Sequence, residues 1–114
     1  MKIRILKSRE YSGILNMGID EMLFLSYNEE KLPVMRFYTW EIPTLSMGYF
    51  QSSKRFHSLK ERDDVAIVRR MTGGRGVIHH LELTYSLVGG YDDVFASLDL
   101  QDTYGAISRI FQSA

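Results

Sequence analysis

The chain of 114 residues contains no cysteine. This absence excludes a disulfide framework and metal sites built on thiolates, and it fits a reducing compartment. It also removes the best nucleophile among protein side chains. The sequence therefore offers no thiol for covalent catalysis.

The sequence also lacks an excess of either charge and any long apolar run. Fourteen basic residues balance fourteen acidic ones, so the whole-chain charge predicts neither a nucleic acid nor an anionic membrane as a partner. The first residues, MKIRILKSREYSG, are too polar for a secretory signal, and no apolar run approaches the roughly 20 residues that a membrane span requires. We therefore expect a cytoplasmic protein.

Length and composition predict one globular unit over residues 1–114. With 45% apolar residues, the chain can bury one core but is too short for two domains of ordinary size. No internal repeat or low-complexity segment divides it.

The spacing of apolar residues predicts a helix and several strands. Apolar residues recur at helical spacing over residues 14–27, after Ser12 as a plausible N-cap. The buried face of this helix is expected to contain Leu15, Ile19, Met22, Leu23 and Leu25. β-branched and aromatic residues, with prolines and glycines between them, predict strands at residues 2–7, 34–40, 44–50, 65–69, 77–78 and 83–88, and residues 51–64 are expected to form a surface loop with a short helical turn.

Two elements carry further expectations. Residues 65–69 (VAIVR) are almost wholly apolar, which is typical of an interior strand buried on both faces. A last helix is expected after Asp102, and no helix-ending signal follows it. Its apolar face, which would need a partner, comprises Tyr104, Ile107, Ile110 and Phe111.

The pair Gly73-Gly74 marks a tight turn after the strand at residues 65–69. Glycines allow positive φ and let successive amides point toward a bound anion. Arg70 and Arg75 flank the turn with guanidinium groups suited to a carboxylate or phosphate, and Thr72 adds a hydroxyl. Spacing alone favours this anion-binding turn no more than an ordinary hairpin turn with solvated arginines.

His79 is the candidate acid or base nearest this turn, although a histidine taken alone is more often a structural or exposed residue. Its ordinary pKa is close to neutrality, so it could donate to, or accept from, a ligand held there. On a strand, His80 would point to the opposite face. His79, His80 and Glu82 are too close in sequence to converge on one ion, and we predict no metal site.

Two other groups of residues have a mainly structural interpretation. Asn16 and Asp20 lie one helical turn apart, and helix capping or surface polarity is the stronger explanation for both. On the strand at residues 34–40, Arg36, Tyr38 and Trp40 share one face. We interpret this strand mostly as core, although one of its faces could line a pocket for an aliphatic chain.

Three motifs, taken in order, resemble the lipoate–protein ligases and octanoyltransferases, which share their catalytic domain with biotin protein ligases. They are NMGIDE at residues 16–21, MRFYTWEIPTLSMGYFQ at 35–51 and RRMTGGRGVIHHLELTYS at 69–86. The arginine after the two glycines is closer to octanoyltransferases that use an acyl carrier protein than to ATP-using ligases. The resemblance implies an α+β fold with a mixed, largely antiparallel sheet and packed helices, of which residues 1–114 would form the N-terminal part.

The resemblance also implies the site residues. Residues 83–86 would form one wall of an acyl pocket, and Gly76 stands where relatives commonly have alanine. The nucleophilic cysteine of the transferases and the essential lysine of the family lie downstream of the matched motifs, so we expect this chain to supply the acyl-binding half and to be inactive by itself. The residues expected to line the pocket and hold the carboxyl end of octanoate or lipoate are Arg70, Thr72, Gly73, Gly74, Arg75, Gly76 and His79.

Three functions remain open. A transferase would pass an octanoyl or lipoyl group from acyl carrier protein to a lysine of a lipoyl carrier domain, such as the glycine cleavage H protein, without a further cofactor. A lipoate–protein ligase would need ATP and Mg, with the glycine turn near the phosphate. A non-catalytic module would only bind the acyl group or a carrier. A C-terminal partner chain or a homodimer is expected, because half a domain exposes a sheet edge.

Overall fold

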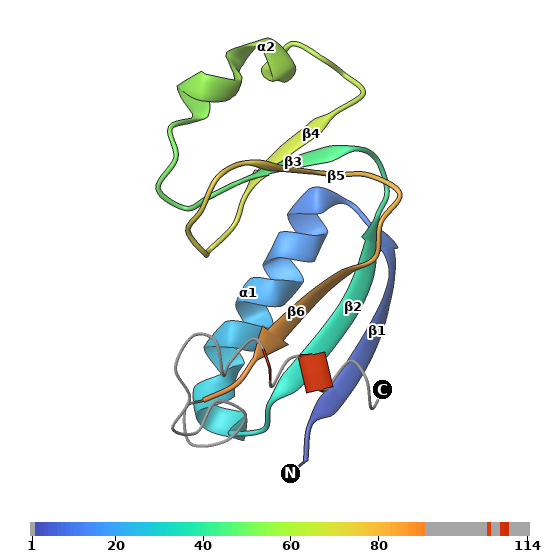
Figure 1. Ribbon diagram of the computed structural model, residues 1–114, viewed down its shortest axis with the longest axis vertical. Helices are drawn as coiled ribbons and strands as arrows, with labels where there is room; N and C mark the ends of the chain where they lie inside the picture. The colour runs from blue at the N-terminus through green and yellow to red at the C-terminus, as the bar shows by residue number, and fades with distance from the viewer. Residues whose placement is uncertain (1, 91–104, 106–107, 110–114) are drawn as a thin grey trace.

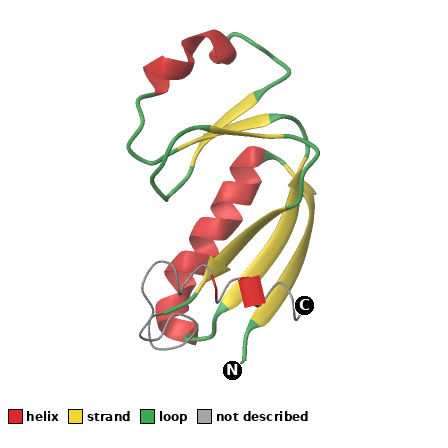
Figure 2. Cartoon of the chain, in the orientation of Figure 1, coloured by secondary structure: helices red, strands yellow, loops and turns green. Residues whose placement is uncertain are grey.

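The computed structural model describes residues 2–90, Gly105, Ser108 and Arg109. Figure 1 shows one long helix beside a sheet, with a second sheet across the end of that helix, and Figure 2 shows the same chain by element type. The predicted last helix lies outside the described residues, as do Asp102, Tyr104, Ile107, Ile110 and Phe111. The elements in order are β1 (Arg4–Tyr11), α1 (Gly13–Glu30), β2 (Val34–Trp40), β3 (Thr44–Met47), the 3-10 helix η1 (Ser53–Phe56), α2 (His57–Lys60), β4 (Ala66–Arg69), β5 (Val77–His79) and β6 (Thr84–Val88).

The strands form two sheets of three strands each. In the first, β2 is central, parallel to β1 and antiparallel to β6. In the second, β3 is central, parallel to β4 and antiparallel to β5. The chain therefore passes from the first sheet to the second between β2 and β3, and returns between β5 and β6 (Figure 1).

The predicted α+β class and the mixed pairing are confirmed, with two differences in detail. The strands form two sheets rather than one, and among the described strands parallel pairings are as numerous as antiparallel ones. The physical reason is that helices connect β1 to β2 and β3 to β4. Such crossover connections return the chain in the same direction, which makes the strands parallel.

The boundaries of α1 follow from its two caps. The Ser12 hydroxyl accepts a hydrogen bond from the Leu15 amide at 3.2 Å, which confirms the predicted N-cap. At the other end, Lys31 adopts a left-handed conformation with φ 53°, and its amide donates to the Tyr27 carbonyl. The helix therefore extends beyond the predicted residues 14–27 to Glu30.

The predicted buried face of α1 is wrong in part. Leu23 is buried and Ile19 packs beside it, with Val34 and Val88 completing this core. The other three predicted positions are exposed, and the face against the sheet instead carries two polar residues, because these meet a buried arginine on β2. The exposed residues are Leu15, Met22 and Leu25, and the buried polar ones are Asn16 and Asp20.

The strand predicted at residues 65–69 forms as β4, but it is not an interior strand. It pairs with β3 alone, at the edge of the second sheet, and Val68 is its one buried residue. Since β4 and β5 both pair with β3 and not with each other, the intervening glycine turn is not a hairpin turn. The predicted surface loop with a helical turn is confirmed by η1 and α2.

The strand predicted at residues 44–50 ends early, at Met47, because the chain turns at Gly48. The Gln51 amide donates to the Gly48 carbonyl, and the Gln51 side chain accepts from the Gly48 amide. This turn packs directly on the glycine turn, where a Cβ built on Gly48 would lie 1.9 Å from the Gly74 carbonyl oxygen. Only glycine fits at position 48, since the obstacle is backbone.

We expect Gly48→Ala to lower the free energy of unfolding by about 1–3 kcal/mol, because overpacking against a fixed backbone forces the two turns apart. Gly18→Ala is the matched control, since its Cβ would meet nothing within 4 Å on an exposed face of α1. That change should stabilise the chain by roughly 0.5–1 kcal/mol. Urea denaturation measures both, and equal effects of the two substitutions would contradict the close approach.

Candidate functional site

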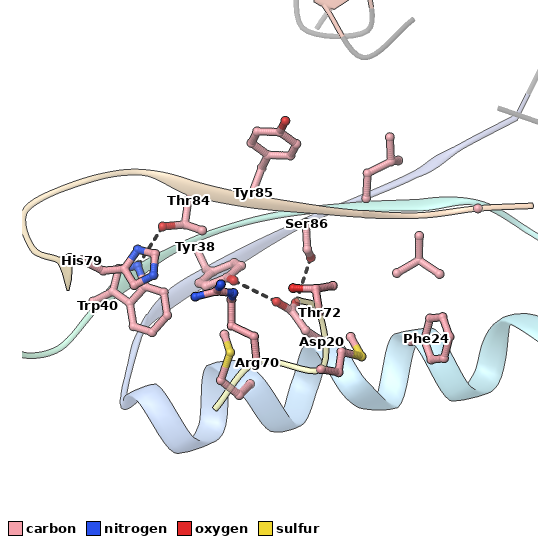
Figure 3. Close-up of a pocket in the computed structure, with 15 residues that line it drawn as sticks. Asp20, Phe24, Tyr38, Trp40, Arg70, Thr72, His79, Thr84, Tyr85 and Ser86 are labelled. Atoms are coloured by element: carbon pink, nitrogen blue, oxygen red, sulfur yellow. Dashed lines mark hydrogen bonds between the residues drawn. The ribbon is translucent and has the colours of Figure 1, made fainter. Parts of the chain in front are cut away.

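A cavity of about 480 Å³ lies where the two sheets meet beside α1. Figure 3 shows Phe24 toward one end and Trp40 with His79 toward the other, while Asp20, Thr72 and Ser86 lie between them. The lining residues are Met17, Asp20, Phe24, Tyr38, Trp40, Arg70, Met71, Thr72, His79 and residues 84–89.

A buried ion pair forms the floor beneath this cavity. Arg36 on β2 is fully buried, and its Nη1 lies 2.8 Å from Oδ1 of Asp20 on α1. The same guanidinium donates to the side-chain oxygen of Asn16 at 2.6 Å and to the Ser8 hydroxyl at 2.9 Å. Asn16 and Asp20 are thus buried partners of Arg36, which corrects their interpretation as capping or surface residues.

Asp20 also orders the polar atoms that line the cavity. Its carboxylate accepts from the Tyr38 hydroxyl and from the Ser86 hydroxyl, each at 2.8 Å. The Tyr38 ring lies 3.8 Å from the Arg36 guanidinium. Burial first, and then the neighbouring Asp20 carboxylate, raise the pKa of Tyr38 far above its ordinary value, so Tyr38 stays a neutral donor.

Arg70 holds the glycine turn together. Its Nη1 donates to the backbone carbonyl and the hydroxyl of Ser46, at 2.6 and 2.8 Å. Its Nη2 donates to the carbonyls of Gly73 and Arg75, both at 2.9 Å. All four terminal N–H groups are therefore directed at protein oxygens, so Arg70 shapes the turn rather than presenting a free fork to a ligand.

The turn itself has the backbone conformation that its glycines permit. Gly74 has φ +96°, which strongly favours glycine. None of the described hydrogen bonds uses the amides of Gly73, Gly74 or Arg75 as donors. These amides, and the exposed Arg75 side chain, are the groups of the turn that can meet an anion or a carbonyl oxygen.

His79 has both ring nitrogens engaged by protein groups. Nε2 lies 2.8 Å from the Ser46 hydroxyl, and Nδ1 lies 3.1 Å from Oε2 of Glu82. The ring stacks on Trp40, with centroids 4.2 Å apart. Although burial opposes the effect, hydrogen bonds from His79 and Thr84 hold the pKa of Glu82 below its ordinary value. His79 is thus placed as a wall of the cavity, while its neighbour His80 is exposed and lies just after the end of β5.

The structure brings some of the predicted site residues to the cavity and not others. Arg70, Thr72 and His79 line it. Gly73, Gly74 and Arg75 form the turn beside it, while Gly76 packs against the Phe56 ring and Leu45. The aromatic face of β2 lines the cavity with Tyr38 and Trp40, which agrees with the pocket considered for that strand. Sequence reasoning missed the contributions of Asp20, Ser46 and Glu82, for which no local pattern gives a signal.

Among the described residues, no three histidine, aspartate or glutamate side chains lie close enough together to hold a metal ion. No described helix combines the length and the apolar character needed to cross a membrane.

An apolar cavity with a few placed polar groups is the usual form of a site for a small molecule. The structure thus defines an α+β domain with a candidate site for a small ligand. The chain belongs to the lipoyl protein ligase A/B catalytic domain family, whose model matches residues 12–114.

The chain is also similar to individual proteins in sequence and in structure. Over 109 residues the chain is 43% identical to octanoyltransferase LipM of Carboxydothermus hydrogenoformans, covering 93% of this chain and 40% of that protein. Protein Ta0514 of T. acidophilum, solved with bound lipoic acid, is similar with a TM-score of 0.72 and 26% identity, over 92% of this chain and 43% of that one. A lipoate-protein ligase A bound with ATP has a TM-score of 0.69 and 28% identity, over 92% and 42%. The chain thus spans about two fifths of the length of the relatives that it matches.

The buried ion pair yields a stability prediction. Arg36→Met should lower the free energy of unfolding by about 3–5 kcal/mol, because the Asp20 carboxylate would remain buried without a compensating charge. Arg4→Met is the control: Arg4 pairs with Glu30 at 2.7 Å, but both side chains are well exposed. Its loss should cost about 0–1 kcal/mol in the same denaturation assay. A cost below 1 kcal/mol for Arg36→Met would show that the network contributes little.

Proposed function

We propose that this chain is the acyl-binding part of an octanoyltransferase that acts in protein lipoylation, transferring an octanoyl or lipoyl group to a lysine of a lipoyl carrier domain. The observation that carries the proposal is the cavity between the two sheets, with apolar walls beside the glycine and arginine turn. Family membership and the similarity to an octanoyltransferase support it.

The acyl chain would lie along the apolar part of the cavity. Phe24 from α1 and Leu87 and Val88 from β6 line this part. A chain of eight carbons gains from such burial at about 0.8 kcal/mol per CH₂ group removed from water. The side chains of Tyr38, Ser86 and Asp20 in the floor are already hydrogen-bonded to one another, so an apolar chain would not strip them of these partners.

The carbonyl end would face the glycine turn. The amides of Gly73, Gly74 and Arg75 supply donors, the Thr72 hydroxyl lies at the cavity wall, and Arg75 supplies an exposed positive charge. Arg70 would act indirectly, since its donors hold the turn in place. Gly76 and His79 would complete the walls. These residues would bind and orient the thioester, and the attacking thiolate must come from outside this chain, which has no cysteine.

In this proposal the reaction needs no cofactor beyond the octanoyl or lipoyl group itself. The donor would be an acyl carrier protein and the acceptor a lipoyl domain such as that of the glycine cleavage H protein, both in the cytoplasm. Residues 1–114 would form part of one catalytic domain, and the remaining part of that domain would supply the nucleophile. The similarity to ligases, one of them bound with ATP, supports the alternative in which ATP and Mg activate the free acid at the same cavity.

Ligand binding by the chain itself is the first test. Trp40 is the only tryptophan and lines the cavity, so octanoate should change its fluorescence in a saturable way. Arg70→Met should weaken octanoate binding by about tenfold or more, equivalent to about 1.4 kcal/mol, because the turn loses its support.

Arg69→Met is the matched control for Arg70→Met. Arg69 also holds loop carbonyls, those of Gly48, Tyr49 and Gln51, but it does not line the cavity. Its loss should leave the affinity within about twofold, well under the tenfold step of 1.4 kcal/mol. Equal losses in both variants, or no saturable response in the unaltered chain, would contradict the assignment of the cavity.

The transfer reaction is tested with the chain combined with the remaining part of the catalytic domain of the C. hydrogenoformans relative. A lipoyl domain should gain the mass of one octanoyl group when octanoyl-acyl carrier protein is supplied without ATP. Transfer from free octanoate that depends on ATP and Mg would assign the ligase instead. Binding of the lipoyl domain without any transfer would identify a non-catalytic module and overturn the proposal.

A further inference from the structure

A continuous chain of hydrogen bonds runs from Trp40 to the glycine turn and crosses between the two sheets. The indole Nε1 of Trp40 donates to the Thr84 hydroxyl at 2.7 Å, and that hydroxyl donates to Oε2 of Glu82 at 2.8 Å. The same oxygen lies 3.1 Å from Nδ1 of His79. Glu82 therefore joins His79 on β5 of the second sheet to Thr84 on β6 of the first and, through Thr84, to Trp40 on β2.

The series of hydrogen bonds continues from His79 to the glycine turn. Nε2 of His79 lies 2.8 Å from the hydroxyl of Ser46, which is fully buried on β3. That hydroxyl accepts from Arg70, whose other nitrogen holds the carbonyls of Gly73 and Arg75. Glu82 is thus connected to the glycine turn through three intervening side chains, those of His79, Ser46 and Arg70.

The chemical type of each group determines which partner donates in each of these hydrogen bonds. Indole and guanidinium N–H groups can only donate, and an ionised carboxylate can only accept. In a neutral imidazole, the ring proton must therefore lie on Nδ1 of His79 and point to Glu82, and Nε2 then accepts the Ser46 hydroxyl proton. In the opposite tautomer, Nδ1 and the carboxylate would be two acceptors facing each other, and the buried Ser46 proton would lose its acceptor.

The geometry points to Glu82 as a positioning residue for the acyl site, a role that rests on the proposed function. By accepting from both His79 and Thr84, Glu82 holds His79 as the Nδ1–H tautomer, keeps the His79 and Trp40 rings stacked as one wall, and keeps Ser46 available to Arg70. Glu82 need not touch the acyl group, since its side chain does not line the cavity. It acts through the residues that do.

Two substitutions test whether the hydrogen-bond-accepting oxygen of Glu82 matters, apart from the charge and the size of its side chain. Both partners of Glu82 use the same oxygen, so the carbonyl of Glu82→Gln can replace it, whereas Glu82→Leu removes the acceptor at similar size. We expect Glu82→Leu to weaken octanoate binding by about tenfold or more and Glu82→Gln by about threefold or less, as read from Trp40 fluorescence.

The tautomer of His79 is a second readout, which needs no ligand. The chain has three histidines, and nitrogen-15 NMR distinguishes a protonated from an unprotonated ring nitrogen. The unaltered chain and Glu82→Gln should show His79 with Nδ1 protonated and Nε2 bare, and Glu82→Leu should lose this pattern. Glu61→Leu is the control, because Glu61 faces His57 in an exposed pair at 3.6 Å.

The outcomes distinguish this inference from the proposed function. If the unaltered chain binds octanoate and a folded Glu82→Leu variant binds it equally well, Glu82 has no positioning role while the acyl site stands. A His79 with Nε2 protonated in the unaltered chain would also overturn the inference. If the chain binds no octanoate although His79 shows the expected tautomer, the proposed function fails and the hydrogen-bond chain is only structural.

Discussion

The arrangement of this molecule depends on one fully buried arginine. Arg36 lies in the central strand of the first sheet, where water cannot solvate its charge. An unpaired charge there would be prohibitively costly, so α1 must present acceptors at that point. Asp20 and Asn16 provide them, one helical turn apart, and this requirement fixes which face of α1 meets the sheet. The apolar residues on the other faces of α1 are exposed as a consequence.

The same constraint creates the cavity. With Asp20 held by Arg36, its carboxylate gathers the hydroxyls of Tyr38 and Ser86, and the strands that carry them form one wall. The opposite wall comes from the second sheet, where Arg70 holds the glycine turn. The chain crosses between the sheets twice, so residues distant in sequence meet at the boundary. An acyl group bound there would contact both sheets, which is the reason that the glycine motif alone could not define the site.

The sequence predicted much of the fold and part of the site. Ser12, as a cap, and the alternating pattern of β2 depend on near neighbours, and both expectations were confirmed. Burial of Asp20 could not be predicted, because its partner Arg36 lies on another element, and the same is true of Ser46 beside His79. The apolar run at residues 65–69 suggested an interior strand, but its position at the sheet edge is set by pairing with β3 alone. The composition of a strand does not report how many neighbours it has.

In the proposed function, the acyl group lies between the two sheets. Nuclear Overhauser effects between octanoate and an isotope-labelled chain test this position. We expect contacts from the octanoate methylenes to the Trp40 indole, the Tyr38 ring and Leu87, which line the cavity. Contacts instead to Met22 and Leu25, which line a shallow hollow on the outer face of α1, would show that the ligand binds elsewhere and that the cavity is not the acyl site.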